Sequence, residues 1–231
     1  MPQQRYAGDE VVERLVRPDF KTQESLQFCI LSFVVKLPSD AKVLAGLASE
    51  QRGVFSTKDL EVALQDRHPA SFARRVRALL EAGVLRRFLR GWYVADTFDL
   101  PTLSQRLAPA SYISFGNVLA RRLLIGTSPQ RQVMAARVGR SRRYRALGYE
   151  IVHLSIAAHL DFGHCAEEGV DWADSEKALL DVLFFHLRGQ RYVFDPFSDI
   201  DLSRLDRERI DTYLERYRNP KFVTFVEGVL S

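Results

Sequence analysis

The chain has 231 residues, of which 46% are hydrophobic, and it carries a formal net charge of +4. This composition is sufficient to bury a core, and the length predicts two small domains. The longest apolar run, Phe28 to Leu37, is interrupted by polar residues and is shorter than the roughly 20 residues of a transmembrane helix. The charged stretch from Met1 to Val16 lacks the apolar centre of a signal peptide, so we expect a cytoplasmic protein.

Charge is distributed in blocks along the chain. Residues 1–99 carry 15 basic and 13 acidic side chains, residues 100–149 carry nine arginines and no acid, and residues 150–231 carry 9 basic and 16 acidic side chains. This pattern indicates a basic interaction surface beside an acidic body. Cys29 and Cys165 lack metal-binding spacing, so we expect two buried, reduced thiols and no disulfide framework.

The N-terminal part of the chain is predicted to be helical. Residues 1–40 are interpreted as an extension, in which periodicity fits either a helix or a strand over Ser25 to Leu37, with helix favoured. Ala41 to Gln51 has helical apolar spacing. We expect it to be the first helix of a domain covering residues 41–100.

The stretch from Gly53 to Ala95 is typical of a winged helix-turn-helix. Ser56 or Thr57 can cap a helix that continues to Leu64, and residues 66–68 form a turn. Pro69 suits the first turn of a second helix, which is predicted to run to Glu81 and to stop at Gly83. Residues 84–89 and 92–95, joined by Arg90 and Gly91, then predict a hairpin, the wing.

Arginines occupy the outward positions of this stretch. Seven arginines stand against two acids between Asp66 and Ala95, which favours DNA as the partner. Helical spacing places Arg74 opposite the apolar face of the second helix, with Ser71, Arg75 and Arg77 beside it. Trp92 and Tyr93 are expected to anchor the wing. The predicted DNA-binding residues are Ser71, Arg74, Arg75, Arg77, Arg86, Arg87, Arg90 and Trp92.

Residues 101–231 are predicted to form a mixed α/β domain with a helical tail, so the fold class is α+β. A new unit should start at Ser111, with Tyr112-Ile113-Ser114 before a helix from Phe115 to Ile125 that is capped by Ser114 and stopped by Gly126. Three strands then predict a small antiparallel meander: Arg131–Val138, Arg142–Leu147 and Tyr149–Ser155. Helices are expected from Asp174 or Ser175, over Leu205–Tyr217 and over Phe222–Leu230.

Three segments resemble the abortive-infection AbiE antitoxin family. They are residues 85–94 of the wing, residues 111–123, and Ala173-Asp174-Ser175-Glu176-Lys177-Ala178-Leu179-Leu180-Asp181, which is similar to the family's A-x-P-E-K-A-L-L-D. Ser175 replaces the usual proline at a helix start, where serine serves as well. The resemblance covers roughly residues 41–185.

The resemblance implies a type IV antitoxin. Such a protein represses its own operon by binding inverted repeats in double-stranded DNA, and it counters a nucleotidyltransferase-like toxin encoded beside it. In that family the second domain is the part usually needed for neutralisation, often without a stable toxin complex. The alternatives are a regulator whose second domain senses a small molecule, and a protein-interaction module that uses the winged fold without DNA.

Enzymatic and metal sites are not indicated. Asp174, Glu176, Lys177 and Asp181 do not follow the order of a nuclease core, and we expect Lys177 to be a surface or inter-element ion-pair partner. The only metal-ligand candidates have no zinc spacing and are expected to be ordinary polar or half-buried side chains: His153, His159, His164 and Cys165. We therefore expect a non-enzyme without a cofactor.

A second basic surface is predicted in the acid-free block, where Arg143 and Arg145 should share one face of a strand. Its members are Arg137, Arg140, Arg142, Arg143 and Arg145, and we expect the arginines from Arg121 to Arg145 to extend the basic surface of the winged stretch. Two readings remain open at this point. The surface contacts operator phosphates or an RNA, or it pairs with the acidic C-terminal third of the same chain.

Overall fold

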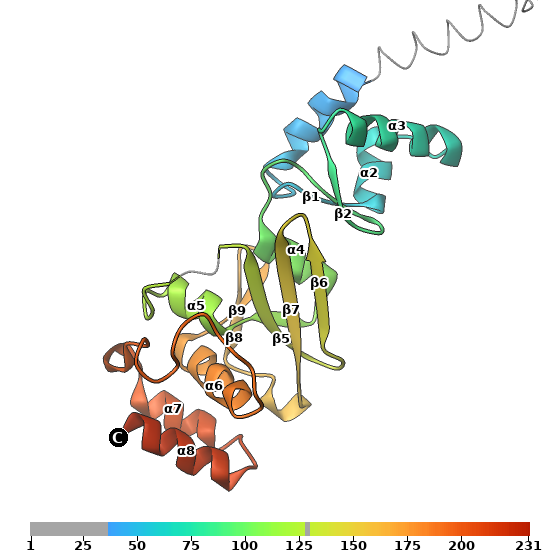
Figure 1. Ribbon diagram of the computed structural model, residues 1–231. Helices are drawn as coiled ribbons and strands as arrows, with labels where there is room; N and C mark the ends of the chain where they lie inside the picture. Colours follow the sequence, from blue (N-terminus) through green and yellow to red (C-terminus); the bar gives the residue numbers. More distant parts are fainter. Residues whose placement is uncertain (1–36, 128–129) are drawn as a thin grey trace, which may run out of the picture.

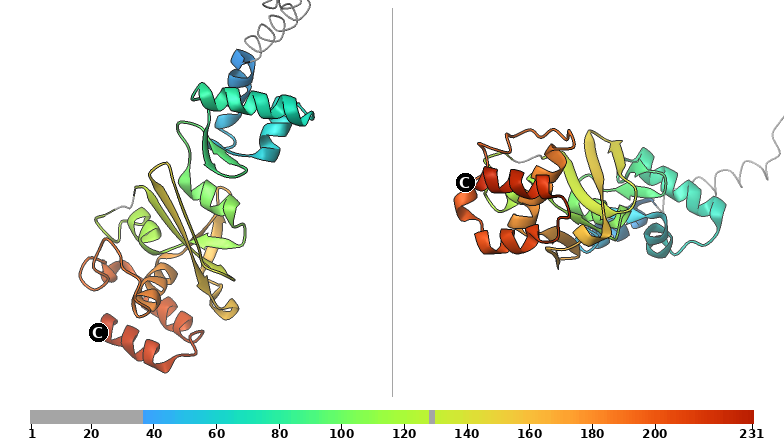
Figure 2. Two further views of the ribbon diagram at one scale, coloured as in Figure 1. Left: turned by 45° about the vertical axis from the view of Figure 1, so that its right-hand side comes forward. Right: turned by 90° about the horizontal axis from the view of Figure 1, so that it is seen from below.

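A computed structural model describes residues 37–127 and 130–231 and shows an α/β protein with two sheets. An N-terminal unit, residues 37–99, lies at one end of the molecule (Figure 1). Residues 100–231 form a C-terminal unit built on the larger sheet, and the last two helices lie at the opposite end in all three views (Figure 2). The expectations for Ser25–Leu37 and for Cys29 fall almost wholly outside the described residues.

The first helix of the N-terminal unit starts and ends earlier than the predicted Ala41–Gln51, whereas the next two follow their predicted caps and breakers. Residues 37–48 are helical. Helix α2 (Thr57–Leu64) begins at a capping box, in which Ser56 and Asp59 each accept a hydrogen bond from the other's backbone N–H. Helix α3 (Pro69–Glu81) starts with proline in its first turn and ends before Gly83, whose φ is +71°.

A three-stranded antiparallel sheet completes this unit. Strands β2 (Arg86–Leu89) and β3 (Trp92–Val94) form the expected hairpin around Gly91. Strand β1 (Val54–Ser56), which the sequence analysis did not include, pairs with β3 and gives the order β1-β3-β2. Its three residues are too few to show a period. Leu44, Phe55, Leu60 and Leu79 close a core between the sheet and the helices.

Helix α4 (Leu100–Leu107) joins the two units and was also missed. Its N-cap Asp99 accepts a hydrogen bond from the Thr102 N–H, a signal that was present in the sequence. Arg106 on α4 reaches back to the N-terminal unit, where it donates to the Val54 carbonyl and forms an ion pair with Asp59. The guanidinium also lies 5.2 Å from the centre of the Trp92 ring. The β2–β3 hairpin is thereby tied to α4.

The larger sheet has six strands and is mixed, which corrects the expected small antiparallel sheet. Its order is β6-β7-β5-β4-β9-β8, with parallel β5–β7 and β4–β9 pairs. The strands are β4 (Ser111–Ile113), β5 (Gln132–Val138), β6 (Arg142–Ala146), β7 (Tyr149–Ile156), β8 (His164–Glu167) and β9 (Val170–Ala173). Strands β8 and β9 had not been predicted.

The predicted meander of β5, β6 and β7 is wrong in its pairing. Strand β7 lies between the other two, so β6 pairs only with β7 and forms an edge. The side chains explain this order: Ile151, Val152 and His153 of β7 are buried, whereas β6 is rich in exposed arginines. Charged side chains suit an edge strand because they discourage pairing with another chain.

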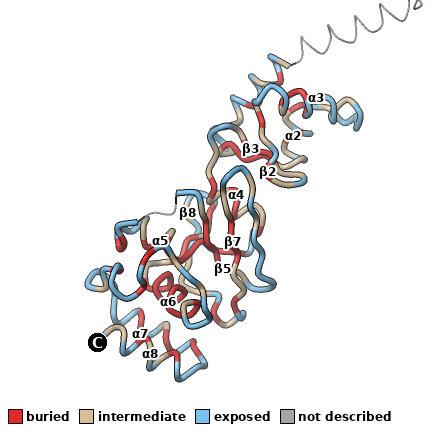
Figure 3. Tube along the Cα trace, viewed as in Figure 1, coloured by how far each residue is buried: buried red, intermediate tan, exposed pale blue. Residues whose placement is uncertain are grey.

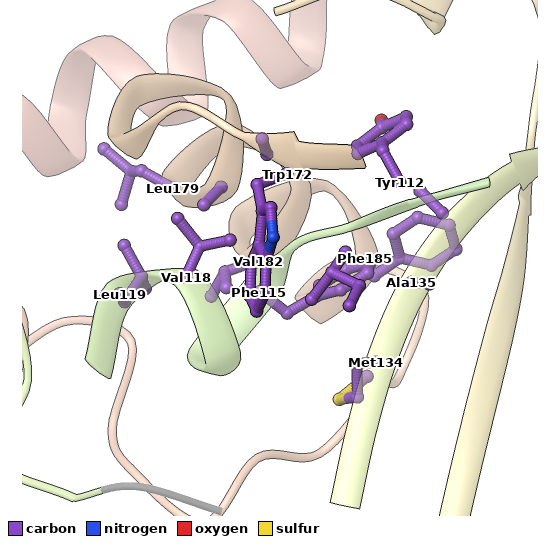
Figure 4. Packing of buried hydrophobic residues seen from close by; sticks show 14 of the residues in the cluster. Tyr112, Phe115, Val118, Leu119, Met134, Ala135, Trp172, Leu179, Val182 and Phe185 are labelled. Atoms are coloured by element: carbon purple, nitrogen blue, oxygen red, sulfur yellow. The ribbon is translucent and has the colours of Figure 1, made fainter. Parts of the chain in front are cut away.

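Helix α6 (Ser175–His186) is the centre of the C-terminal core. Figure 4 shows Leu179, Val182 and Phe185 of α6 facing Phe115, Val118 and Leu119, with Trp172 beside them. Almost every residue of α6 is buried, as the red tube in Figure 3 shows. An internal helix of this kind holds any polar side chain it carries away from water.

Helix α5 (Phe115–Arg121) is shorter than expected. It ends before Leu123, whose φ is +59°, rather than at Gly126. Ser114 is its N-cap residue, but its hydroxyl donates to Asp181 at 2.7 Å instead of accepting from the helix. The Ser114 hydroxyl was predicted to cap α5, but it is bound to the buried Asp181 carboxylate instead.

The helical tail is confirmed. Helices α7 (Arg207–Leu214) and α8 (Pro220–Leu230) are separated at Asn219, which caps α8. They follow two single turns, η1 (Ala158–Leu160) and η2 (Leu202–Arg204). No helix among the described residues is long and apolar enough to cross a membrane.

Candidate nucleic-acid interface

One face of α3 is exposed along its length. Ala70, Ala73, Arg74 and Arg77 are exposed, whereas Val76 and Leu79 are buried on the opposite side. The predicted apolar stripe is thus confirmed, and Arg74 lies opposite it. Two alanines beside two arginines leave room for a partner to approach the helix backbone closely, a feature that the sequence analysis did not single out.

Arg75 is held inside the N-terminal unit, which corrects its expected outward position. Its Nε donates to Asp40 at 2.8 Å, and its Nη1 donates to the Leu64 carbonyl at 2.9 Å and to Asp66 at 3.2 Å. Only 15% of its side chain is exposed, and 5% of that of Asp40. The hydrogen bond to Asp40 raises the pKa of Arg75 despite burial. Arg75 therefore ties α3 to the turn before it and to the helix of residues 37–48.

Ser71 is engaged in the same way. Its hydroxyl donates to Asp66 at 2.7 Å, and this hydrogen bond is the main reason that the pKa of Asp66 lies below its usual value. Asp66 also accepts from the His68 N–H and from Arg75. The turn between α2 and α3 is consequently built around one carboxylate, and Ser71 serves that turn.

The three arginines of the β2–β3 hairpin differ in their exposure and in their hydrogen-bond partners. Arg86 donates to the Asp96 carbonyl at 2.9 Å and lies 3.7 Å from the Asp96 carboxylate. Arg87 and Arg90 are exposed, and neither forms an ion pair with any described residue. Trp92 is half-buried under Arg106, as expected for an anchor.

Five of the seven arginines therefore face outward. Arg67, in the turn before α3, is exposed and had not been included among the site residues. Its position in the turn, two residues before Pro69, could have indicated this, because turn residues seldom bury a guanidinium. The exposed set, here called the outward arginines, is Arg67, Arg74, Arg77, Arg87 and Arg90.

The second basic block is largely paired within the chain. Arg143 and Arg145 share a face, as expected, and both bind Glu150 on β7. Burial raises the pKa of Glu150, but the hydrogen bonds from Arg145, Gln132 and Arg143 outweigh it and leave the pKa below its ordinary value. Arg121 and Arg122 both bind Glu167 on β8. For these four arginines the interpretation that holds is pairing with the acidic C-terminal third of the same chain.

Arg137, Arg140 and Arg142 differ from those four. They lie around the β5–β6 turn, Arg140 and Arg142 are exposed, and none of the three forms an ion pair with a described residue. The parallel pairing of β5 with β7 places this turn at the end of the sheet away from the N-terminal unit (Figure 1). The five residues predicted to share one basic surface are thus divided between a paired and an unpaired group.

The residues considered above for nuclease or metal-binding chemistry lie in different environments. Lys177 is buried and paired with Asp181 on the same helix, so the expectation of a surface or inter-element ion-pair partner is wrong, although an ion pair is present. His153 is buried against Ser104 Oγ at 3.0 Å. Cys165 is exposed rather than buried, since it lies on the edge strand β8. The described residues contain no group of His, Cys, Asp and Glu able to hold a metal ion.

Comparison with known proteins gives a fold and no family. No family model and no curated protein matches the chain. Among solved structures, it is similar to the RV2827C protein from Mycobacterium tuberculosis, with a TM-score of 0.58 and 16% sequence identity. The alignment covers 84% of this chain and 77% of that chain. At this identity the likeness establishes a shared fold alone.

Proposed function

We propose that residues 41–100 form a winged helix-turn-helix that binds double-stranded DNA, and that the protein is a cytoplasmic transcriptional autorepressor and antitoxin of the AbiE type. In this proposal α3 is the recognition helix and the β2–β3 hairpin is the wing. Residues 101–231 form the domain that counters a nucleotidyltransferase-like toxin. The protein is not an enzyme and needs no cofactor.

The observation that carries the DNA-binding proposal is the sorting of the arginines. Arg75 and Arg86 satisfy acceptors inside the N-terminal unit, whereas the outward arginines lie on α3, on the turn before it and on the hairpin after it. A protein surface that contacts only water does not require so many arginines close together. A surface that meets a phosphate backbone does, because each contact releases condensed counterions.

The outward positions divide into two roles. Arg74, flanked by Ala70 and Ala73, is suited to enter the major groove, where arginine can donate two hydrogen bonds to guanine. Arg67 and Arg77 are suited to phosphates beside the groove. Arg87 and Arg90 are suited to the phosphates or the minor groove reached by a wing. Base contacts supply sequence preference, and phosphate contacts supply position.

The antitoxin part of the proposal is supported by the sequence resemblance. Its third segment coincides with the start of α6, where Asp174 caps the helix and Lys177 and Asp181 form a buried pair. These residues stabilise the C-terminal unit, so the role of this segment is structural. The neutralising activity itself rests on the resemblance alone.

A gel-shift titration of the full chain tests the repressor role. The DNA is the region upstream of the chain's own gene, and a random duplex of equal length is the control. We expect a clear preference for the upstream region at moderate salt. Equal binding to both duplexes would contradict the repressor role.

Co-expression tests the antitoxin role separately. If a nucleotidyltransferase-like gene lies beside the gene for this chain, its expression should arrest growth and the full chain should restore it. An Arg74→Ala variant should restore growth equally well, because neutralisation is assigned to the other unit. Failure of the wild-type chain to restore growth would contradict the antitoxin role and leave the gel-shift result unaffected.

A further inference from the structure

A cleft of about 470 Å³ lies at the far end of the C-terminal unit from α3. Three segments meet there: the end of β7 with η1, the end of α6, and the loop between α7 and α8 (Figure 1). It is lined by Ser155, Ile156, Ala157, His159, Leu160, Phe184, Arg188, Tyr217, Arg218 and Asn219.

No acidic side chain lines this cleft, although residues 150–231 carry 16 acids. Arg188 and Arg218 are both exposed, and neither forms an ion pair with any described residue. The contrast with Arg121, Arg122 and Arg143 is direct, because each of those binds a glutamate. Two cations in an acid-free concavity create a local positive potential that favours an anion.

Neighbouring groups add to this potential. Asn219 caps the eleven-residue helix α8 and lines the cleft, so the positive end of the helix dipole lies at its edge. Ser155 also lines the cleft, and its N–H donates to Ser141 in the β5–β6 turn. That turn carries Arg140, which is exposed and without an acidic partner among the described residues.

The remaining wall of the cleft is apolar and aromatic. Ile156 and Leu160 contribute aliphatic atoms, and Phe184 and Tyr217, which are largely buried in the core, contribute aromatic atoms. The Arg188 guanidinium lies 4.0 Å from the centre of the Phe184 ring, which fixes its plane at the rim. An arginine held in this way loses little freedom when its guanidinium donates two hydrogen bonds to the oxygens of a phosphate.

We propose that this cleft binds a nucleoside phosphate. The phosphates would be held by Arg188 and Arg218, and the base would lie against the apolar wall. The volume falls within the range of roughly 300–1,000 Å³ found for small-molecule sites, which combine an apolar lining with a few placed polar groups. The inference goes beyond operator binding, since the cleft and α3 lie at opposite ends of the molecule (Figure 1).

Isothermal titration calorimetry of the full chain tests the proposal. The probes are ATP, GTP, inorganic pyrophosphate and adenosine, each titrated at constant ionic strength. We expect saturable binding of at least one nucleotide, weaker binding of pyrophosphate, and weaker binding of adenosine. Absence of saturable binding for both nucleotides, or adenosine binding as tightly as ATP, would overturn the proposal.

Three variants locate the site. Arg188→Gln and Arg218→Gln should each weaken nucleotide binding about tenfold or more, because each removes a hydrogen bond between charged groups. Arg122→Gln is the matched control, since it removes an exposed arginine elsewhere on the same unit, and it should bind as the wild type does. Arg218 has no ion-pair partner among the described residues, so its loss should not impair folding, which circular dichroism checks. Unchanged affinity in both cleft variants would overturn the assignment.

Discussion

Arg74 and Arg75 are adjacent on α3, yet they lie in different environments. Arg74 is exposed, and Arg75 is bound by Asp40, Asp66 and the Leu64 carbonyl. A helical wheel places the two residues 100° apart and cannot distinguish a solvent position from one facing a buried carboxylate. The deciding residue, Asp40, lies 35 positions away in the sequence.

This difference predicts opposite effects of similar substitutions. Arg75→Ala should lower the free energy of unfolding by about 3 kcal/mol, because it leaves the nearly buried Asp40 without its cation. Arg77→Ala, on the exposed face of the same helix, should change it by less than about 0.5 kcal/mol. Urea denaturation measures both. A similar loss in the two variants would show that Arg75 is not an internal anchor.

His153 makes the stability depend on pH. Burial, followed by the nearby charges of Arg137 and Arg142, lowers its pKa from 6.5 to about 4. Its Nε2 contacts Ser104 Oγ, whereas its Nδ1 is buried without a partner among the described residues. The folded protein therefore holds the ring neutral, and the unfolded chain binds a proton more readily.

Because the pKa of His153 is lowered on folding, acid destabilises the folded protein. The neutral ring's full contribution is present above about pH 6.5, and it is lost as the pH falls from there towards 4. Between pH 7 and pH 4.5 this one group should cost about 2–3 kcal/mol. His153→Gln, which does not titrate, should reduce the pH dependence of urea unfolding by that amount. An identical pH profile in the variant would contradict the assignment.

At the level of elements, helix α6 shows why the segment resembling the AbiE family is polar at its start. Lys177 is surrounded by the rings of Tyr112, Phe162 and Tyr217, and its ammonium group is paired with Asp181. Asp181 also accepts from Ser114 and Tyr112, which join α5 and β4 to α6. A charge pair one turn apart on a buried helix thus connects three elements.

A double-mutant cycle tests this role. Lys177→Met should lower the free energy of unfolding by about 3–5 kcal/mol, since it leaves a buried carboxylate without its cation. The Lys177→Met, Asp181→Asn double variant should be less destabilised than the sum of the two single variants, because neither change then leaves a charge unpaired. Additive losses, measured by urea unfolding, would show that the two side chains do not act as a pair.

The elements that could be predicted from sequence are those with local signals. Caps and breakers predicted the end of α2, its start to within one residue and both ends of α3, and Gly91 marked the β2–β3 turn. Strand pairing depends on distant residues, so the position of β7 between β5 and β6 could not be obtained from the turn alone. Strands β1, β8 and β9 were missed because three or four residues are too few to show a period.

At the scale of the whole molecule, charge pairing separates the arginines more clearly than sequence position does. For the acid-free block of residues 100–149 the sequence left open nucleic-acid contact or pairing within the chain, and Glu150 and Glu167 neutralise four of its arginines. Exposed arginines are found at both ends of the molecule: the outward arginines of the N-terminal unit, and Arg188 and Arg218 at the cleft. Arg106 binds the N-terminal unit to the sheet between them.

The central claim is that the outward arginines contact DNA, and that the arginines bound to Glu150 and Glu167 do not. The most direct measurement is the dependence of the binding constant on salt concentration for the full chain on its upstream duplex. Arg77→Ala and Arg87→Ala should each reduce the slope of log K against log [salt] by about one, as expected for the loss of one phosphate contact. Arg122→Ala, whose side chain is paired with Glu167, should leave the slope unchanged. Equal slopes for the wild type, Arg77→Ala and Arg87→Ala would contradict the account.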